Sequence, residues 1–219
     1  MSIEKSPVST DVDFEKNGKH FSYLRVPYSR NTSAWGAVTI PIVVVKNGNG
    51  PTVLFVGGNH GGEYEGPVTL LKLIRSLEAG QIQGRVIIMP ALNLPAVQAG
   101  ERVSPIDGLD MNRSFPGKYN GTTTQVIAHY VHEAILPLCD AVVDLHSGGY
   151  SLDLLPYNSM HYLPDEDLRQ RRAGRAVAMA KNGVCEGCGL TASNSKIQQA
   201  RTGLELKYCS TCGRILYVP

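Results

Sequence analysis

Short apolar runs recur along the first two thirds of the chain and predict β-strands. Residues 20–29 and 37–46 alternate or run apolar with many β-branched side chains, while residues 52–56, 85–90 and 141–145 are apolar almost throughout. Short, nearly continuous apolar strands are typical of a sheet that is covered on both faces. We therefore expect a buried sheet at the centre of the protein.

Segments with a helical spacing of apolar residues lie between and after these strands. Residues 65–77 and 125–138 are predicted helices, and residues 165–180 have an amphipathic pattern that ends at Lys181-Asn-Gly183. Residues 93–124 are predicted to form a long loop. The alternation of strands and helices favours an α/β fold with a mixed, mostly parallel sheet flanked by helices.

Composition limits the class of protein. The chain has 219 residues, of which 42% are hydrophobic and 18% charged, as expected of a soluble globular protein with a substantial core. No long apolar segment follows the first methionine, and the apolar runs are too short for a transmembrane helix. We therefore expect a cytoplasmic protein with no membrane partner. The formal net charge of +2 is too small to indicate nucleic acid as a partner.

Three residues predict a catalytic metal site. His60 follows the apolar strand 52–56, Glu63 comes three residues later, and His146 directly follows the apolar strand 141–145. If the two strands are parallel neighbours, their ends bring the three side chains to one edge of the sheet. Two imidazoles and one carboxylate can hold zinc with its fourth position open for water, which is the catalytic rather than the structural pattern.

Local features around these residues support the zinc interpretation. Gly61 and Gly62 are expected to let the backbone turn sharply, so that Glu63 opens the following helix. Asp144 lies two residues before His146, so on a strand both side chains point to the same face. Its carboxylate would orient the imidazole as a hydrogen-bond acceptor or, alternatively, cap a nearby turn. His-x-x-Glu also occurs by chance, but two strand-end histidines with a glycine pair favour zinc.

Three stretches resemble the succinylglutamate desuccinylase/aspartoacylase family of zinc carboxypeptidase-like hydrolases. They are residues 57–66 (GGNHGGEYEG), 110–117 (DMNRSFPG) and 144–149 (DLHSGG), and the likeness extends over roughly residues 20–180. It is greatest to the branch that removes acetyl groups from N-acetyl diamino acids in ectoine breakdown. The resemblance implies that residues 1–181 are the N-terminal part of a zinc amidohydrolase domain, whose substrate is a small N-acyl amino acid.

The resemblance also implies roles for residues of the long loop. Arg102 would stabilise the developing oxyanion, while Asn112 and Arg113 would hold the substrate carboxylate, which suits the forked geometry of a guanidinium group. Alternatively, Arg113 pairs with Asp107 or Asp110 and only fixes the loop.

The family's general base is a glutamate in a Thr-Glu-Leu-Gly-like strand, and this sequence has no such segment. The only later glutamate at a comparable distance, Glu205, lies between two cysteine pairs. We therefore leave the general base unassigned and expect hydrolysis to be impaired, since a positioned acid or base contributes about 10²–10⁴-fold to the rate. The family's further strands are missing as well, so we expect an exposed sheet edge, which a homo-oligomer could cover.

The C-terminal residues carry a second metal-binding pattern. Cys185-x-x-Cys188 and Cys209-x-x-Cys212, each followed by glycine, are separated by twenty residues. Two matched pairs favour a closed structural zinc site of four thiolates over redox-active thiols. We therefore expect a zinc ribbon in residues 184–219, similar to the four-cysteine ribbons at the ends of coiled-coil proteins, joined to the first domain near Lys181.

Two functions of different classes follow from the sequence. The first is a hydrolase with one catalytic and one structural zinc, acting on the amide bond of an N-acyl amino acid. The second is a catalytically silent zinc-binding protein whose ribbon contacts another protein or a nucleic acid.

Overall fold

The computed structural model describes residues 6–150, 152, 177–181, 183–185, 191, 193–202, 207, 210 and 215–217 of the chain. The chain divides into two compact units, residues 1–153 and residues 154–219. The domain limits expected from the sequence, with a join near Lys181, stay a prediction.

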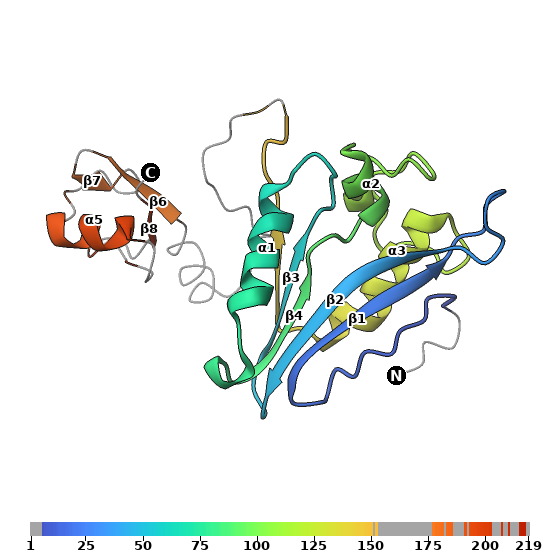
Figure 1. The fold of residues 1–219 in the computed structure, drawn as a ribbon, viewed down its shortest axis with the longest axis horizontal. Helices are drawn as coiled ribbons and strands as arrows, with labels where there is room; N and C mark the ends of the chain where they lie inside the picture. The colour runs from blue at the N-terminus through green and yellow to red at the C-terminus, as the bar shows by residue number, and fades with distance from the viewer. Residues whose placement is uncertain are drawn as a thin grey trace. The chain divides into compact units, whose positions relative to one another are not determined.

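The first unit is built on a five-stranded sheet with the strand order β1-β2-β4-β3-β5 (Figure 1). The strands are β1 (Gly18–Pro27), β2 (Ala37–Asn47), β3 (Thr52–Gly57), β4 (Gly84–Met89) and β5 (Ala141–Leu145). All five were expected from the apolar runs, with ends that agree to within two residues.

The sheet is mixed, as expected, but it is not mostly parallel. β3 runs parallel to β4 and to β5, whereas β2 is antiparallel to both β1 and β4. The connections over residues 28–36 and 48–51 contain no helix. Both are shorter than the dozen or so residues that a parallel crossover needs, so the strands that they join cannot form parallel pairs.

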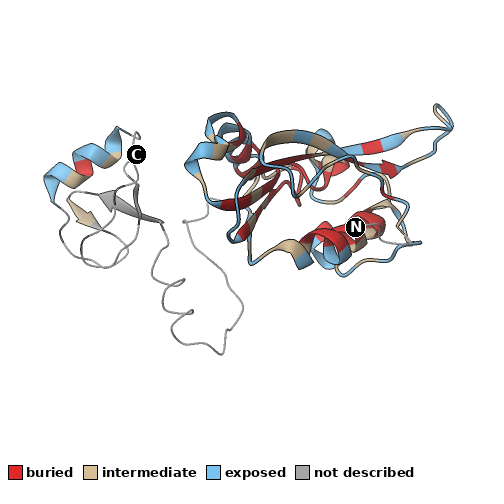
Figure 2. Ribbon diagram, turned by 90° about the horizontal axis from the view of Figure 1, so that it is seen from below, coloured by how far each residue is buried: buried red, intermediate tan, exposed pale blue. Residues whose placement is uncertain are grey.

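Helices cover both faces of the sheet (Figure 1). α1 (Glu65–Ser76) packs Leu70 and Ile74 against one face, and α3 (Thr123–Tyr130) packs Ile127 against the other. Alternate residues of each strand point to opposite faces, so the apolar strands bury side chains on both sides. Buried residues accordingly gather in the sheet and along the helices that cover it (Figure 2).

Several short helices complete the unit: η1 (Ala79–Gln81), α2 (Leu94–Ala99), η2 (Met111–Arg113), η3 (Val131–Ile135) and η4 (Leu136–Leu138). The loop predicted over residues 93–124 therefore contains two helical pieces. The predicted helix 125–138 is confirmed in extent, but α3 changes to a π-helical turn and then to a 3-10 turn. Pro137 contributes to this change because it has no N–H to continue the α-helical hydrogen bonds.

At the beginnings of β3 and β4, a buried arginine ties the N-terminal segment to the sheet. Arg85, which is 9% exposed, donates to the Thr52 hydroxyl at 3.1 Å, to the Phe14 carbonyl at 2.9 Å and to the Glu15 carboxylate at 2.6 Å. The N–H of Thr52 donates to Asp140 at 2.7 Å. This end of the sheet is opposite to the strand ends that lead to His60 and His146.

The last strand, β5, lies at the edge of the sheet. Within the described residues it pairs with β3 only, and Val142 and Val143 are 49% and 41% exposed. This agrees with the exposed edge expected from the sequence.

In its described residues, the second unit contains a three-stranded sheet in the order β7-β6-β8 and the helix α5. The elements are β6 (Val177–Lys181), β7 (Val184–Cys185), α5 (Asn194–Arg201) and β8 (Ile215–Tyr217). The helix predicted over residues 165–180 is wrong for its last four residues, which belong to β6, and its remainder lies outside the described residues. β6 pairs with β7 and β8, and these strand pairings hold residues 177–181 in an extended rather than a helical conformation.

The predicted zinc ribbon stays a prediction. Cys185 is the last residue of β7, while Cys188, Cys209 and Cys212 lie outside the described residues.

Among the helices that the structure describes, none combines the length and apolar character needed to cross a membrane.

Candidate metal centre

The three predicted ligands meet at the carboxyl ends of β3 and β5. These strands are parallel neighbours, with Val56 opposite Asp144, so the residues that follow them emerge at the same edge. His60 and His146 therefore lie close together, with ring centroids 5.0 Å apart. Glu63 does not open a helix as predicted, because α1 begins two residues later at Glu65.

The two glycines between His60 and Glu63 lie where neighbouring atoms leave no room for a side chain, and neither has the positive φ that favours glycine. The N–H of Gly61 donates to the Glu101 carbonyl at 2.7 Å, and a Cβ at Gly61 would overlap the carbonyl oxygen of Ala96. The left-handed conformation that favours glycine occurs earlier, at Gly58, where φ is 68°. Gly61 is thus needed because the loop after β3 passes against the backbone of α2.

Glu63 lies between the two histidines. One carboxylate oxygen is 2.7 Å from His60 Nδ1, and the other is 2.8 Å from His146 Nδ1. The three potential ligand atoms all lie within 4.8 Å of one another. His60 is buried, Glu63 is partly buried and His146 is exposed, so the group lies at the surface of the unit rather than in its core.

The other ring nitrogen of each histidine faces an aspartate. His60 Nε2 is 3.2 Å from Asp110, and His146 Nε2 is 2.9 Å from Asp144. The hydrogen bond to Asp144 raises the pKa of His146 to about 9, against the opposing effect of burial, and Glu63 adds to the rise. An imidazole bonded to a carboxylate through one nitrogen presents the other to a metal in a fixed orientation.

The carboxylates of the site are held in their ionised form. Burial would raise the pKa of Glu63, but hydrogen bonds from the Ser147 N–H and from both histidines lower it overall. Burial would likewise raise the pKa of Asp110, but the bond with His60 and the charge of Arg102 lower it. Ionised carboxylates beside two facing imidazole nitrogens are suited to bind a cation.

The predicted substrate-binding residues surround the same site. Arg102 lies 3.2 Å from Asp110 and 4.0 Å from Glu63, with its side chain 59% exposed. The amide nitrogen of Asn112 lies 3.1 Å from His146 Nε2. Arg113 is 3.8 Å from Asp110 and largely exposed, so the alternative in which it pairs with this aspartate is compatible with the structure.

Three residues that contact either a candidate ligand or the aspartate behind His146 were not predicted from the sequence to do so. Asp110 bonds His60, and Asn59 bonds Asp144 through its side-chain amide. Ser147 donates its N–H to Glu63 at 3.1 Å and its hydroxyl to Glu65. All lie within the motifs that carry the family resemblance, so membership of those motifs was the available signal.

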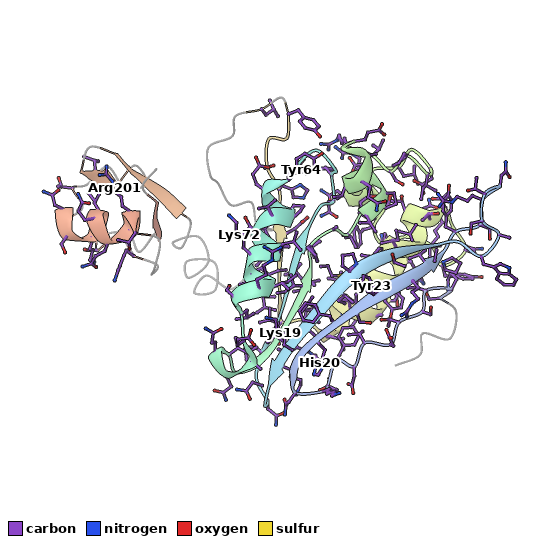
Figure 3. The ribbon with its side chains drawn as sticks, viewed as in Figure 1. Lys19, His20, Tyr23, Tyr64, Lys72 and Arg201 are labelled. Atoms are coloured by element: carbon purple, nitrogen blue, oxygen red, sulfur yellow. The ribbon has the colours of Figure 1, made fainter. Side chains whose placement is uncertain are left out.

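A tyrosine pair lies beside the site. The hydroxyls of Tyr64 and Tyr150 are 2.6 Å apart, and their rings meet edge to face. Tyr64 lies at the beginning of α1 (Figure 3). A Cβ at Gly62 would come within 2.9 Å of the Tyr150 ring, so the absence of a side chain at Gly62 makes room for that ring.

Comparison with known proteins identifies the family. The model of the succinylglutamate desuccinylase/aspartoacylase catalytic domain matches residues 49–200, which include all three ligand candidates. The chain belongs to this family. Its match extends past Lys181 into the second unit.

Individual members of the desuccinylase/aspartoacylase family are closely similar to the chain. N-alpha-acetyl-L-2,4-diaminobutyric acid deacetylase of Halomonas elongata is 52% identical over 168 residues, covering 77% of this chain and 49% of that protein. A succinylglutamate desuccinylase/aspartoacylase structure from Rhodobacter sphaeroides is 51% identical, with a TM-score of 0.64, covering 66% of this chain and 45% of that one. The product-bound ectoine utilization protein EutE (DoeB) from Ruegeria pomeroyi is 45% identical, with a TM-score of 0.74, covering 80% of this chain and 56% of that one.

The chain thus spans about half the length of these relatives. The similarity in fold and sequence confirms the predicted α/β architecture of the first unit.

Proposed function

We propose that this chain is a zinc-dependent hydrolase that cleaves the amide bond of an N-acyl amino acid. The observation that carries the proposal is the convergence of His60, Glu63 and His146, with both Nδ1 atoms turned toward one carboxylate. The identity of 52% with an enzyme named as a deacetylase of N-acetyl-diaminobutyric acid supports the reaction class and suggests an N-acetyl diamino acid as substrate.

The donor set fits zinc. Zn²⁺ accepts imidazole nitrogen and carboxylate oxygen, and three protein ligands with an open fourth position are typical of catalytic sites. Each imidazole is backed by an aspartate through its other nitrogen, which is the usual environment of a zinc-binding histidine. Zinc bound here would supply Lewis acidity toward an amide carbonyl and an acidified water at neutral pH.

Other residues of the site have roles in binding and orientation. The guanidinium of Arg102, beside Glu63 and Asp110, would stabilise the negative charge that develops on the carbonyl oxygen as water adds to the carbon. Asn112 and Arg113, which follow Asp110 on the exposed side of the site, would hold the carboxylate of the amino acid. Asp144 would keep the imidazole of His146 in its ligating orientation.

Completion of the reaction requires a proton to reach the leaving amine as the carbon–nitrogen bond breaks. The family's glutamate for this transfer has no counterpart in the 219 residues, and the general base stays unassigned. We therefore propose that hydrolysis by this chain alone is weak. A loss of about 10²–10⁴-fold corresponds to the usual contribution of a positioned acid or base.

Zinc content and turnover together test the proposal. Elemental mass spectrometry of the purified chain should give about two zinc ions, one at the proposed catalytic site and one at the proposed cysteine site. Each ion needs its full set of ligands, so removal of one ligand should empty that site alone. His146→Ala should lose one ion and all turnover of N-acetyl-2,4-diaminobutyric acid, and Cys209→Ala should lose only the other ion. A single ion that is insensitive to His146→Ala, or turnover that this substitution leaves unchanged, would refute the catalytic site. Robust turnover by the unmodified chain would exclude the catalytically silent alternative and the proposed impairment.

A further inference from the structure

Asn59 makes an unusual contact with the aspartate behind His146. Its side chain is buried, with the residue 3% exposed, and its amide nitrogen lies 2.7 Å from each of the two carboxylate oxygens of Asp144. A single NH₂ group has two hydrogens, so it can donate one to each oxygen. Asn59 thereby binds both oxygens of the Asp144 carboxylate from the buried side.

The orientation of the Asn59 amide is fixed by this contact. The opposite orientation would place the amide oxygen against two negatively charged oxygens. In the observed orientation, Oδ1 of Asn59 is buried and has no hydrogen-bond partner within the described residues. An unpaired buried acceptor costs about 1–3 kcal/mol, whereas bonds to an ionised carboxylate are among the stronger ones. The chain tolerates this cost at a position where an apolar residue would avoid it, which points to a role for the NH₂ group.

The backbone at Asn59 is itself fixed by hydrogen bonds from a second asparagine, Asn93. Its carbonyl accepts a bond from the side-chain amide of Asn93 at 3.3 Å, and the Gly58 carbonyl accepts one from the Asn93 N–H at 3.0 Å. Asn93 is completely buried. By contrast, the side chains of Asp144, on the edge strand β5, and of His146, directly after it, are 36% and 33% exposed. A carboxylate in that position needs an anchor to keep one orientation.

We propose that Asn59 is a positioning residue that fixes Asp144 and, through it, the imidazole of His146 for metal binding. A neutral donor is suited to this role. It holds the carboxylate without neutralising it, so Asp144 remains an anionic partner for His146, whereas a cation at residue 59 would compete with the imidazole. The inference rests on the proposed metal site, to which it adds an inner anchor.

The experiment compares Asn59→Ala, Asp144→Ala and the double variant in the full chain. The first readout is the ¹⁵N resonances of the His146 ring in metal-free protein, which report its hydrogen bonds directly. The second is the affinity for Co²⁺, measured from its visible spectrum, in which cobalt bound to thiolates gives separate charge-transfer bands. Thr52→Val is the matched control, since it removes a buried polar partner of Arg85 at the opposite end of β3, the strand that precedes Asn59.

We expect Asn59→Ala to shift the His146 resonances and to lower the affinity for Co²⁺ by about 10–100-fold, as for other outer partners of metal ligands. In the Asp144→Ala background the same substitution should change the affinity by less than about twofold, because the two residues act in series. Thr52→Val should lower the melting temperature and leave both readouts unchanged.

Several results would overturn the proposal. Unchanged resonances and affinity in Asn59→Ala would do so, as would an equal loss of affinity in the presence and absence of Asp144. If Asn59→Ala does not fold, the Asp144→Ala variant provides the test, because Asp144 is exposed. An unchanged affinity for Co²⁺ in this variant would show that Asp144 does not position His146, and the proposed link from Asn59 through Asp144 would fail. If the unmodified chain binds no Co²⁺ outside the thiolate site, the proposed function fails, while the ring resonances still test the anchor.

Discussion

Asp144 accepts a hydrogen bond from Nε2 of His146 at 2.9 Å, and this leaves Nδ1 of the same ring facing Glu63 at 2.8 Å. With a carboxylate at each nitrogen, the ring carries a proton on both when no metal is present, and its pKa is raised to about 9. A metal that binds at Nδ1 must therefore displace a proton.

This competition predicts a pH dependence of metal affinity. Below pH 9 most of the metal-free protein has His146 protonated, so the affinity for zinc should rise with pH, by up to about tenfold per unit, and level off near pH 9. Chelator competition between about pH 7 and about pH 9 measures this. Asp144→Asn should move the plateau to lower pH, because it removes the main cause of the raised pKa. An affinity that does not vary with pH would contradict the prediction.

Asp110 is predicted to be as important as Asp144, although it bonds the other histidine. Asp110→Asn weakens the contacts to His60 and Arg102, and zinc affinity should fall by about 10–100-fold. Asp107→Asn is the matched control, since Asp107 lies in the same loop but bonds Thr124 instead. Isothermal titration with zinc should separate the two variants. Equal losses would mean that the loop, rather than the contact with His60, determines affinity.

Gly61→Ala should damage the site through backbone crowding. The new methyl group meets the carbonyl of Ala96, so the loop between His60 and Glu63 must shift, at a cost of about 1–3 kcal/mol in the free energy of unfolding. Gly80→Ala is the control, since its Cβ would enter open space. Urea denaturation and zinc content provide the two measurements. A Gly61→Ala variant as stable and as zinc-rich as the Gly80→Ala variant would disprove this account.

The exposed edge strand is predicted to promote self-association. Val143→Lys places a charge on β5 without disturbing the core, because this side chain is already 41% exposed. Edge strands with apolar side chains pair readily with other chains, and lysine opposes such pairing. Light scattering over a concentration series should show a smaller mean mass for Val143→Lys than for the unmodified chain. Val68→Lys adds the same charge at a 48% exposed position on α1, away from the edge strand, and serves as the matched control.

The strands were predictable because each is a short apolar run that is buried on both faces. The meeting of the candidate metal ligands was predictable for the same reason, since His60 comes shortly after one of these runs and His146 directly after another. Strand direction was harder to predict. The antiparallel pairing of β2 with β4 depends on contacts between residues such as Val44 and Ile87, far apart in sequence, that no local pattern records.

Contacts behind the ligands were also beyond the sequence analysis. Asp110 is fifty residues from His60, and Asn59 is eighty-five residues from Asp144. Each pair meets only because the loop after β4 and the end of β5 return to the end of β3.

The hydrogen bonds of the buried Arg85 lie at the opposite end of the sheet from the candidate metal site, so stability and metal binding depend on different residues. Substitutions near Thr52, Arg85 and Asp140 act on how firmly the N-terminal segment holds the sheet, and the six residues of β3 lie between them and the loop that carries His60. At a rise of about 3.3 Å per residue, roughly 20 Å of strand separates them from the metal centre. An engineer could therefore raise the thermal tolerance of this scaffold at one end while redesigning metal or substrate preference at the other.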